Sequence, residues 1–253
     1  MIVAALWRYP VKSMQGERVG RLELDRRGVV GDRRYGVLDL ASGTVISAKR
    51  DGRLLAASAT LDGGEVVMVL PTGERTSGTG PAVDAALSDW LGRPVHLVEA
   101  APERRATFES PSDFEEDDSE LERWEGPPGS FVDSSPVHVL TTASLRALVR
   151  ERPELQWEPR RFRPNIVVAT DRDGLVEEAW VGRRLSFAEA ALDVAKPCSR
   201  CVMTTREQPG GITRQLDVLR HVNGEHATNL GVLAAVARGG AIGASEAVAL
   251  VGG

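Results

Sequence analysis

Lys-Pro-Cys-Ser-Arg-Cys-Val-Met-Thr-Thr, residues 196 to 205, contains both cysteines of this chain, Cys198 and Cys201. A thiolate is a soft ligand that suits zinc, copper, iron–sulfur clusters and other soft metals, and cationic neighbours favour the thiolate form. Pro197 and Ser199 disfavour a regular helix, so we expect this stretch at a strand end or in a loop. Two thiols alone leave a metal site incomplete.

Three interpretations of the Cys-x-x-Cys pattern remain open from the motif itself. Structural zinc normally takes four protein ligands, but the sequence has no second cysteine pair, and His221 and His226 fall in an expected loop. A thioredoxin-like redox pair belongs at a helix start beside a βαβ pattern, whereas this motif follows a strand-like run from Ala190 to Val194. The third interpretation is two ordinary, half-buried cysteines. The surrounding residues have to decide.

The composition is that of a globular chain. Of its 253 residues, 42% are hydrophobic and 26% charged, and the net charge of −5 gives no basic surface for nucleic acid. The 26 glycines and 14 prolines favour many short strands joined by turns. The sequence shows no signal-peptide pattern and no apolar run long enough to cross a membrane, so we expect a cytoplasmic protein without a membrane partner.

The first hundred residues predict a series of strands and one helix. An apolar strand over residues 2 to 7 leads into Lys12 and Ser13, an ammonium and a hydroxyl that together suit an oxyanion or a solvated turn. Arg33 follows Asp32 beside another apolar strand. Residues 81 to 91 predict a helix that begins with a proline at its first turn.

An abrupt change in composition follows this region. Nine acidic residues and a single base lie between Glu109 and Glu125, and Gly-Pro-Pro-Gly ends the run at residue 129. We expect a solvated surface loop over residues 106–130, with the docking of a basic partner as the alternative. This loop would divide an N-terminal region, residues 1–105, from a second domain, residues 131–253.

The second half again predicts strands, with polar groups at their ends. A strand from residue 131 to 140 is followed by Thr141, which caps a helix that reaches about Arg150. Arg163 and Asn165 precede an apolar strand from Ile166 to Ala169. Polar and cationic residues therefore recur at strand ends in both halves. The sequence contains no Gly-x-Gly-x-x-Gly, Walker loop or serine elbow.

Taken in order, Tyr-Pro-Val-Lys-Ser at residues 9–13, Phe-Arg-Pro-Asn-Ile-Val at 162–167 and Cys-Ser-Arg-Cys at 198–201 resemble the MOSC-domain proteins. The similarity is closest to the branch that has an N-terminal MOSC β-barrel region and includes the mitochondrial amidoxime-reducing components. It extends over nearly the whole chain and implies a mostly β fold with a few helices. A MOSC-type β-barrel would pack against an N-terminal β-rich region.

The resemblance also implies a molybdenum cofactor, a pterin dithiolene that holds molybdenum together with one protein cysteinate. By its place in the motif, Cys201 would be the metal ligand and the catalytic residue. Because the dithiolene contributes two sulfurs, one protein thiolate is enough, and the cofactor's phosphate explains scattered cations and hydroxyls. The matching cofactor contacts are Lys12, Ser13, Arg33, Thr141, Arg163, Asn165, Ser199, Arg200 and Cys201.

The implied activity is reduction of N-hydroxylated or N-oxide compounds, which are small-molecule substrates. The chain has no flavin or nicotinamide fingerprint and no iron–sulfur cysteine set, so electrons would come from an external electron-transfer protein. One alternative is a carrier of sulfur, as a persulfide, or of the molybdenum cofactor. Another is a barrel that binds a small anion without redox chemistry.

Overall fold

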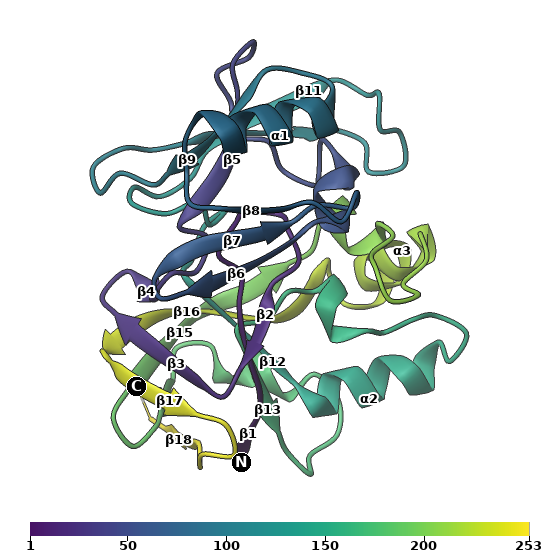
Figure 1. Ribbon diagram of the computed structural model, residues 1–253. Coiled ribbons are helices and arrows are strands. Elements are labelled where there is room, and N and C mark those ends of the chain that lie inside the picture. Colours follow the sequence, from purple (N-terminus) through teal and green to yellow (C-terminus); the bar gives the residue numbers. More distant parts are fainter. Residues whose placement is uncertain (253) are drawn as a thin grey trace.

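The computed structural model describes residues 1–252, and strands form most of its regular structure (Figure 1). The described residues include three α-helices, which agrees with the prediction of a mostly β protein with a few helices. None of these helices has the length and apolar character needed to cross a bilayer. The helical segments are α1 (Pro81–Leu91), α2 (Thr142–Glu151), α3 (Leu216–Glu225) and the 3₁₀ turns η1 (Gly52–Ala56), η2 (Pro159–Arg161), η3 (Val176–Trp180) and η4 (Val202–Thr205).

An eight-stranded sheet forms the lower half of the molecule in Figure 1, in the order β18-β14-β15-β16-β12-β13-β1-β2. In the described part of this sheet β12 and β13 alone pair in parallel, and α2 lies in the crossover that a parallel pair requires. The strands are β1 (Ile2–Arg8), β2 (Glu17–Val19), β12 (Val137–Thr141), β13 (Ile166–Ala169), β14 (Arg184–Ser186), β15 (Ala191–Ser199), β16 (Asn229–Arg238) and β18 (Ala249–Val251).

The large sheet curls so that its two ends approach each other. An isolated bridge joins Ile2 in β1 to Ala247, just before β18, and the Val3 amide donates to the Glu246 carbonyl at 2.8 Å. Apolar side chains at alternate positions therefore converge on one core, to which a small sheet from both halves of the chain also contributes. That small sheet has the order β17 (Gly240–Gly243), β3 (Arg21–Asp25) and β4 (Gly28–Val29).

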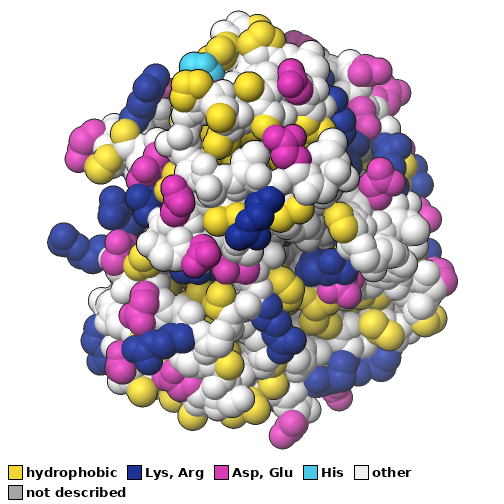
Figure 2. Space-filling model, in the orientation of Figure 1, with side chains coloured by type: hydrophobic (Ala, Val, Ile, Leu, Met, Phe, Trp, Pro, Cys, Tyr) yellow, Lys and Arg dark blue, Asp and Glu magenta, His cyan; other side chains and the backbone are white. Residues whose placement is uncertain are grey.

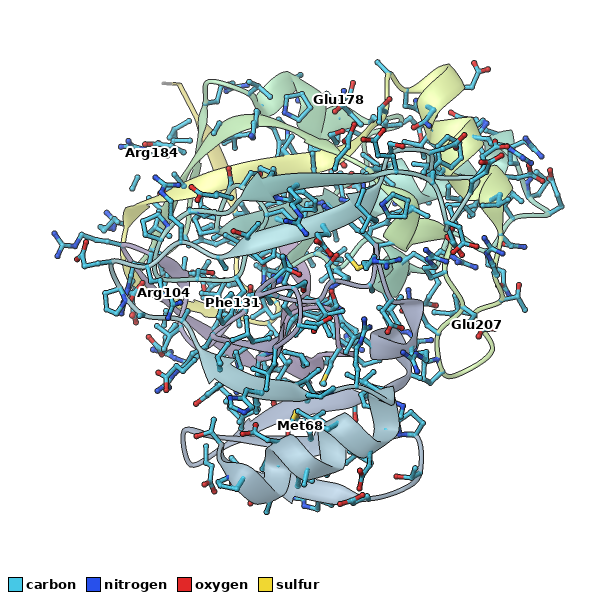
Figure 3. All side chains as sticks on the ribbon, turned by 90° about the horizontal axis from the view of Figure 1, so that it is seen from above. Met68, Arg104, Phe131, Glu178, Arg184 and Glu207 are labelled. Carbon is cyan, nitrogen blue, oxygen red and sulfur yellow. The ribbon has the colours of Figure 1, made fainter. Side chains whose placement is uncertain are left out.

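A second core lies above the large sheet. It packs α1 on two small antiparallel sheets, and Met68, labelled in Figure 3, lies fully buried beside α1. Residues 1–105 thus contribute to two cores, because β1 to β4 belong to the lower one and the later strands to the upper one. The upper strands are β5 (Tyr35–Asp39) with β9 (Val95–Glu99), and β6 (Ser58–Asp62), β7 (Glu65–Val69) and β8 (Arg75–Ser77).

Helices α2 and α3 share a third core on the flank of the large sheet. Leu148 of α2 packs with Val218 and Val222 of α3, and the rings of Trp157 and Phe162 stack beside them. His221, expected in a loop, lies in α3, because the apolar stripe of this helix continues to Val222.

The acidic segment is a β-hairpin: its tip, residues 112–120, is the exposed loop expected from composition, whereas its two arms are strands. Strands β10 (Thr107–Pro111) and β11 (Leu121–Glu125) pair in regular antiparallel register. Phe108 is fully buried and packs against the Trp124 ring, with centroids 5.6 Å apart. Two aromatic anchors thus offset the charge density that predicted an extended loop.

Three of the nine carboxylates between Glu109 and Glu125 form ion pairs with arginines of the described chain, and one of these three, Glu109, pairs with Arg123 inside the hairpin. Asp117 forms ion pairs with Arg206 at 2.6 Å and Arg214 at 3.5 Å, and Glu115 pairs with Arg220 at 2.7 Å. Acidic and basic side chains are likewise interspersed over the face shown in Figure 2. The hairpin therefore bridges to the second half of the chain through its own charges.

We expect Gly231→Ala to destabilise the protein by roughly 2–4 kcal/mol. Gly231 has a φ of +79°, and a Cβ there would lie 2.4 Å from His138 Nε2 and 2.8 Å from the Val139 carbonyl oxygen. The matched control is Gly20→Ala, since Gly20 has open space around it and an ordinary φ. Urea unfolding of both variants measures the difference, and equal stabilities would contradict the packing of β16 against β12.

Candidate functional site

A cleft that is open to solvent lies between the upper and lower parts of the molecule. Segments far apart in sequence line this cleft. Phe131, labelled in Figure 3, forms part of the cleft wall near the middle of the molecule. The structure brings together eight of the nine residues predicted to bind a cofactor. These are Lys12, Ser13, Arg33, Arg163, Asn165, Ser199, Arg200 and Cys201.

Thr141 is the predicted residue that the structure does not bring to the cleft. It is fully buried at the N-cap of α2, where its Oγ1 accepts from the Ser144 amide at 3.1 Å. The same hydroxyl donates to Glu177 Oε2 at 2.7 Å. The Thr141 hydroxyl is therefore used in capping the helix and satisfying a buried carboxylate.

Positive charge dominates the cleft. Among the lining side chains that the structure describes, five are cationic and one is a carboxylate. The carboxylate, Asp133, accepts from Lys12 Nζ at 2.7 Å and pairs with Lys49 Nζ at 3.1 Å. The other cations are Arg33, Arg163 and Arg200.

Burial changes the protonation of this lysine–carboxylate bridge. Desolvation lowers the pKa of Lys12 to about 8, although Asp133 opposes the shift. Burial also disfavours the ionised Asp133, but Lys12 and Lys49 outweigh it and hold the pKa of that carboxyl well below its usual range. The bridge thus carries a net positive charge at neutral pH, and part of that charge can be lost just above it.

Two arginines lie against the ring of one buried tyrosine. The guanidinium carbons of Arg33 and Arg163 lie 4.6 and 4.2 Å from the centroid of the Tyr9 ring. Arg33 is paired with Asp32 and donates to Asn165 Oδ1 at 3.2 Å. Among residues 1–252 Arg163 has no carboxylate partner; its Nη1 donates to the Met14 carbonyl at 2.6 Å. Burial, with the nearby Arg33, lowers the pKa of Arg163 to about 10, so it remains a cation at neutral pH.

The backbone is strained where it places these groups. Ser13, Arg33 and Arg163 have φ values of 68°, 44° and 53°, in the left-handed region that disfavours residues with a Cβ. Such conformations cost of order 1–3 kcal/mol each and gather at functional sites, where surrounding structure enforces them. Three strained residues around one cleft make it the candidate functional site.

The cysteine motif lies where β15 ends, as expected. Cys198 is buried in the strand, and Arg200 Nη1 donates to its Sγ at 2.9 Å. The Arg200 amide donates to the Thr228 carbonyl at 2.7 Å, which fixes the turn. Cys201 follows at the start of η4, half-buried in the cleft wall, and both cysteines are free thiols. The cleft therefore exposes one thiol and holds the other beneath a guanidinium.

Three buried polar atoms in the cleft wall have no hydrogen-bond partner among the described residues. They are Arg163 Nη2, Arg200 Nε and His138 Nε2. Unsatisfied buried groups are costly, so a ligand with acceptor atoms would stabilise them. Desolvation lowers the pKa of His138 to about 3, which makes it a neutral imidazole. A polar, anionic group beside Cys201 fits this donor set.

Sequence reasoning did not find Lys49, Asp133 or His138. The rarity of lysine could have pointed to Lys49: the chain has only three lysines, and two of them, Lys12 and Lys49, line the cleft. Asp133 and His138 carry no local pattern, and only the packing of residues 131–138 against the N-terminal region reveals them.

The fold and the cleft define a mostly β protein with a cationic, thiol-bearing cavity. Residues 127–249 match the family model of the MOSC domain, and residues 1–99 match that of the MOSC N-terminal beta barrel domain. The chain therefore belongs to the MOSC-domain proteins that carry this N-terminal domain.

The sequence identity to individual relatives is below 30%. The chain is 27% identical to mitochondrial amidoxime-reducing component 1 of Homo sapiens, over 86% of this chain and 69% of that protein. It is 23% identical to molybdenum cofactor sulfurase of Homo sapiens, over 85% of this chain but 27% of that protein. Among solved structures, the YUAD protein from Bacillus subtilis has a TM-score of 0.47 at 12% identity, with 100% of this chain and 96% of that chain covered.

We expect sulfate to bind in the cleft and its affinity to fall roughly tenfold from about pH 7 to pH 9. The pKa of Lys12 is lowered to about 8, so its positive charge is present at the lower pH and lost as the pH rises through that value, while sulfate keeps its charge. Calorimetric titration of wild type and Cys201→Ser separates this effect from ionisation of the thiol. Lys12→Gln should bind weakly at both pH values; a retained slope in that variant would contradict the assignment.

Proposed function

We propose that this protein is a molybdenum-cofactor-dependent reductase of N-hydroxylated or N-oxide compounds. The observation that supports this most is the position of Cys201, a free thiol in the wall of an open cleft that also carries five cations. A site with one thiolate suits a metal that brings other sulfur ligands, and its cations suit an anionic cofactor.

The chain's own residues have distinct tasks in this proposal. Cys201 would ligate the metal, while Arg163 and Arg200 would donate to the cofactor through the guanidinium nitrogens that lack partners. Arg33 and Asn165 hydrogen-bond to each other and would fix one wall in a single orientation. When bound, the cofactor would supply two-electron oxygen-atom transfer; the protein positions it and sets the electrostatic field around it.

The substrate class and the electron source come from comparison. The relatives named amidoxime-reducing components support an N-hydroxylated substrate. Because the sequence has no flavin or nicotinamide fingerprint, an external electron-transfer protein would supply the electrons.

A sulfur or cofactor carrier is the second candidate. Similarity to molybdenum cofactor sulfurase favours it, as does the partial exposure of Cys201 in an open cleft, since a carrier thiol must reach another protein. In this case Cys201 would hold a persulfide, and the cations of the cleft would favour the anionic sulfur.

We expect Cys201→Ser to lose roughly a hundredfold or more of its reductase activity, with the fold retained, because a hydroxyl does not replace a thiolate ligand. The assay measures reduction of an aryl amidoxime by dithionite-reduced viologen, with molybdenum per chain determined in parallel. Cys198→Ser is the matched control and should stay within about threefold of wild type, because Cys198 lies buried under Arg200 and its hydroxyl replacement can still accept that bond.

The same samples distinguish the two candidates. About one molybdenum per wild-type chain with amidoxime turnover supports the reductase. The carrier function would be favoured over the reductase if cyanide released sulfane sulfur from wild type but not from Cys201→Ser, and wild type showed neither molybdenum nor turnover. Unchanged turnover in Cys201→Ser would contradict both.

A further inference from the structure

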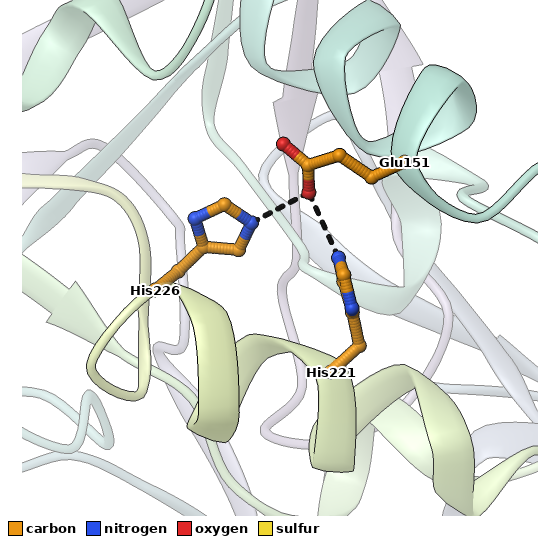
Figure 4. Close-up of side chains that lie close together, drawn as sticks. All are labelled: Glu151, His221 and His226. Atoms are coloured by element: carbon orange, nitrogen blue, oxygen red, sulfur yellow. Dashed lines mark hydrogen bonds and ion pairs between the residues drawn. The ribbon is translucent and has the colours of Figure 1, made fainter.

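A second group of potential metal ligands lies outside the cleft, where the ends of α2 and α3 meet (Figure 4). Glu151 is the last residue of α2, His221 lies in α3, and His226 directly follows α3. The Nε2 atoms of both histidines point at the same carboxylate oxygen, Glu151 Oε2, each at 2.8 Å. The three ligand atoms lie within 4.8 Å of one another.

Packing holds the two imidazoles in place. The side chains of His221 and His226 are 9% and 13% exposed, against 37% for Glu151. The His221 ring packs against Trp157, with centroids 5.7 Å apart, and meets the His226 ring edge-on at 5.5 Å. The site is thus closed on its protein side and open beside the carboxylate, where solvent can supply a further ligand.

The backbone after His226 is strained. Ala227 and Thr228 have φ values of 47° and 68°, consecutive left-handed residues of which one is β-branched. Two hydrogen bonds hold this turn: the Thr228 amide donates to the Val222 carbonyl of α3 at 3.1 Å, and the Asn229 amide donates to the His226 carbonyl at 2.8 Å. A conformation of this kind persists where something else stabilises it, and the turn presents His226 to its two partners.

We propose that Glu151, His221 and His226 form a binding site for a divalent transition-metal ion of the zinc type. Two imidazole nitrogens and one carboxylate oxygen are a preferred donor set for zinc, with water in the fourth position. Ligands at about 2.0–2.2 Å from zinc stand a little over 3 Å apart, so the observed N–O distances of 2.8 Å need only a small expansion. Magnesium and calcium prefer oxygen ligands and would bind poorly.

Such an ion would connect the ends of two helices and fix the turn that follows them. The Thr228 carbonyl in that turn accepts the Arg200 amide at 2.7 Å, and Asn229 pairs with Ser199 across β15 and β16. The ion would therefore stabilise the strained turn that supports the cysteine motif, without contacting the cleft. This inference does not depend on the proposed reductase activity.

The test is zinc binding by calorimetry and equilibrium dialysis, with wild type, Glu151→Gln and His226→Gln. We expect wild type to bind one equivalent that both variants bind about tenfold or more weakly, and zinc, but not magnesium, to raise the melting temperature of wild type alone among these three. His96→Gln is the matched control. His96 is exposed on β9, in the upper part of the molecule, so its replacement should change neither zinc affinity nor the zinc-dependent melting temperature. Circular dichroism checks folding; if His226→Gln does not fold, the isosteric Glu151→Gln decides.

Cobalt distinguishes this site from the cysteines. Cobalt bound to imidazole and carboxylate shows weak visible bands, whereas cobalt bound to a thiolate adds intense near-ultraviolet charge transfer. We expect the cobalt equivalent that wild type binds and Glu151→Gln does not to show no thiolate charge-transfer band. Absence of zinc binding by wild type, or equal binding by wild type and both variants, would overturn the proposal and leave a histidine–carboxylate hydrogen-bond cluster.

Discussion

The cleft depends on keeping five cationic side chains close together in a partly buried site. Like charges repel, and burial removes the water that would screen them. Asp133 relieves part of this cost between Lys12 and Lys49, and Asp32 relieves another part at Arg33. Within the described part of the chain, the Arg163 guanidinium contacts the Met14 carbonyl oxygen and the Tyr9 ring but no carboxylate. The compensation is incomplete, and the positive charge that remains is what would attract an anionic ligand.

The same cleft requires both halves of the chain to fold together. Strand β1 from the N-terminus inserts into the large sheet next to β13, and the Trp7 amide donates to the Asn165 carbonyl at 2.8 Å. Ser13, Arg33 and Arg163, which contribute side chains to the cleft, themselves have left-handed backbone conformations. A rigid sheet on one side and packed cores on the other can enforce such strain, which isolated loops could not.

Much of the cleft lining could be predicted from the sequence, because the motifs that carry the family resemblance are short and contiguous. Arg163 and Asn165 precede a strand, and Cys201 follows one, so local patterns suffice to place them at strand ends. Thr141 has the same pattern, yet Glu177 lies close enough to take its hydroxyl, which only tertiary packing decides.

The errors elsewhere have the same origin. Composition predicted a solvated acidic loop, but composition does not reveal that Phe108 finds a core or that Asp117 finds Arg206. His221 and His226 were expected in a loop, whereas His221 lies in α3 and both meet a carboxylate from another helix, Glu151, 70 residues before His221. Non-local partners, not local propensities, account for each difference.

The hairpin shows how an acidic segment can support a cationic cleft. Its two aromatic rings lie behind the lysines, Phe108 3.8 Å from Lys12 Nζ and Trp124 4.1 Å from Lys49 Nζ. Arg206, bound at the hairpin tip by Asp117, donates to the Lys49 carbonyl at 3.0 Å. Because Asp117 is partly exposed, this ion pair contributes little stability by itself. Its effect is on position: the hairpin is tied to the backbone of a cleft lysine, while its rings stabilise the ammonium groups without neutralising them.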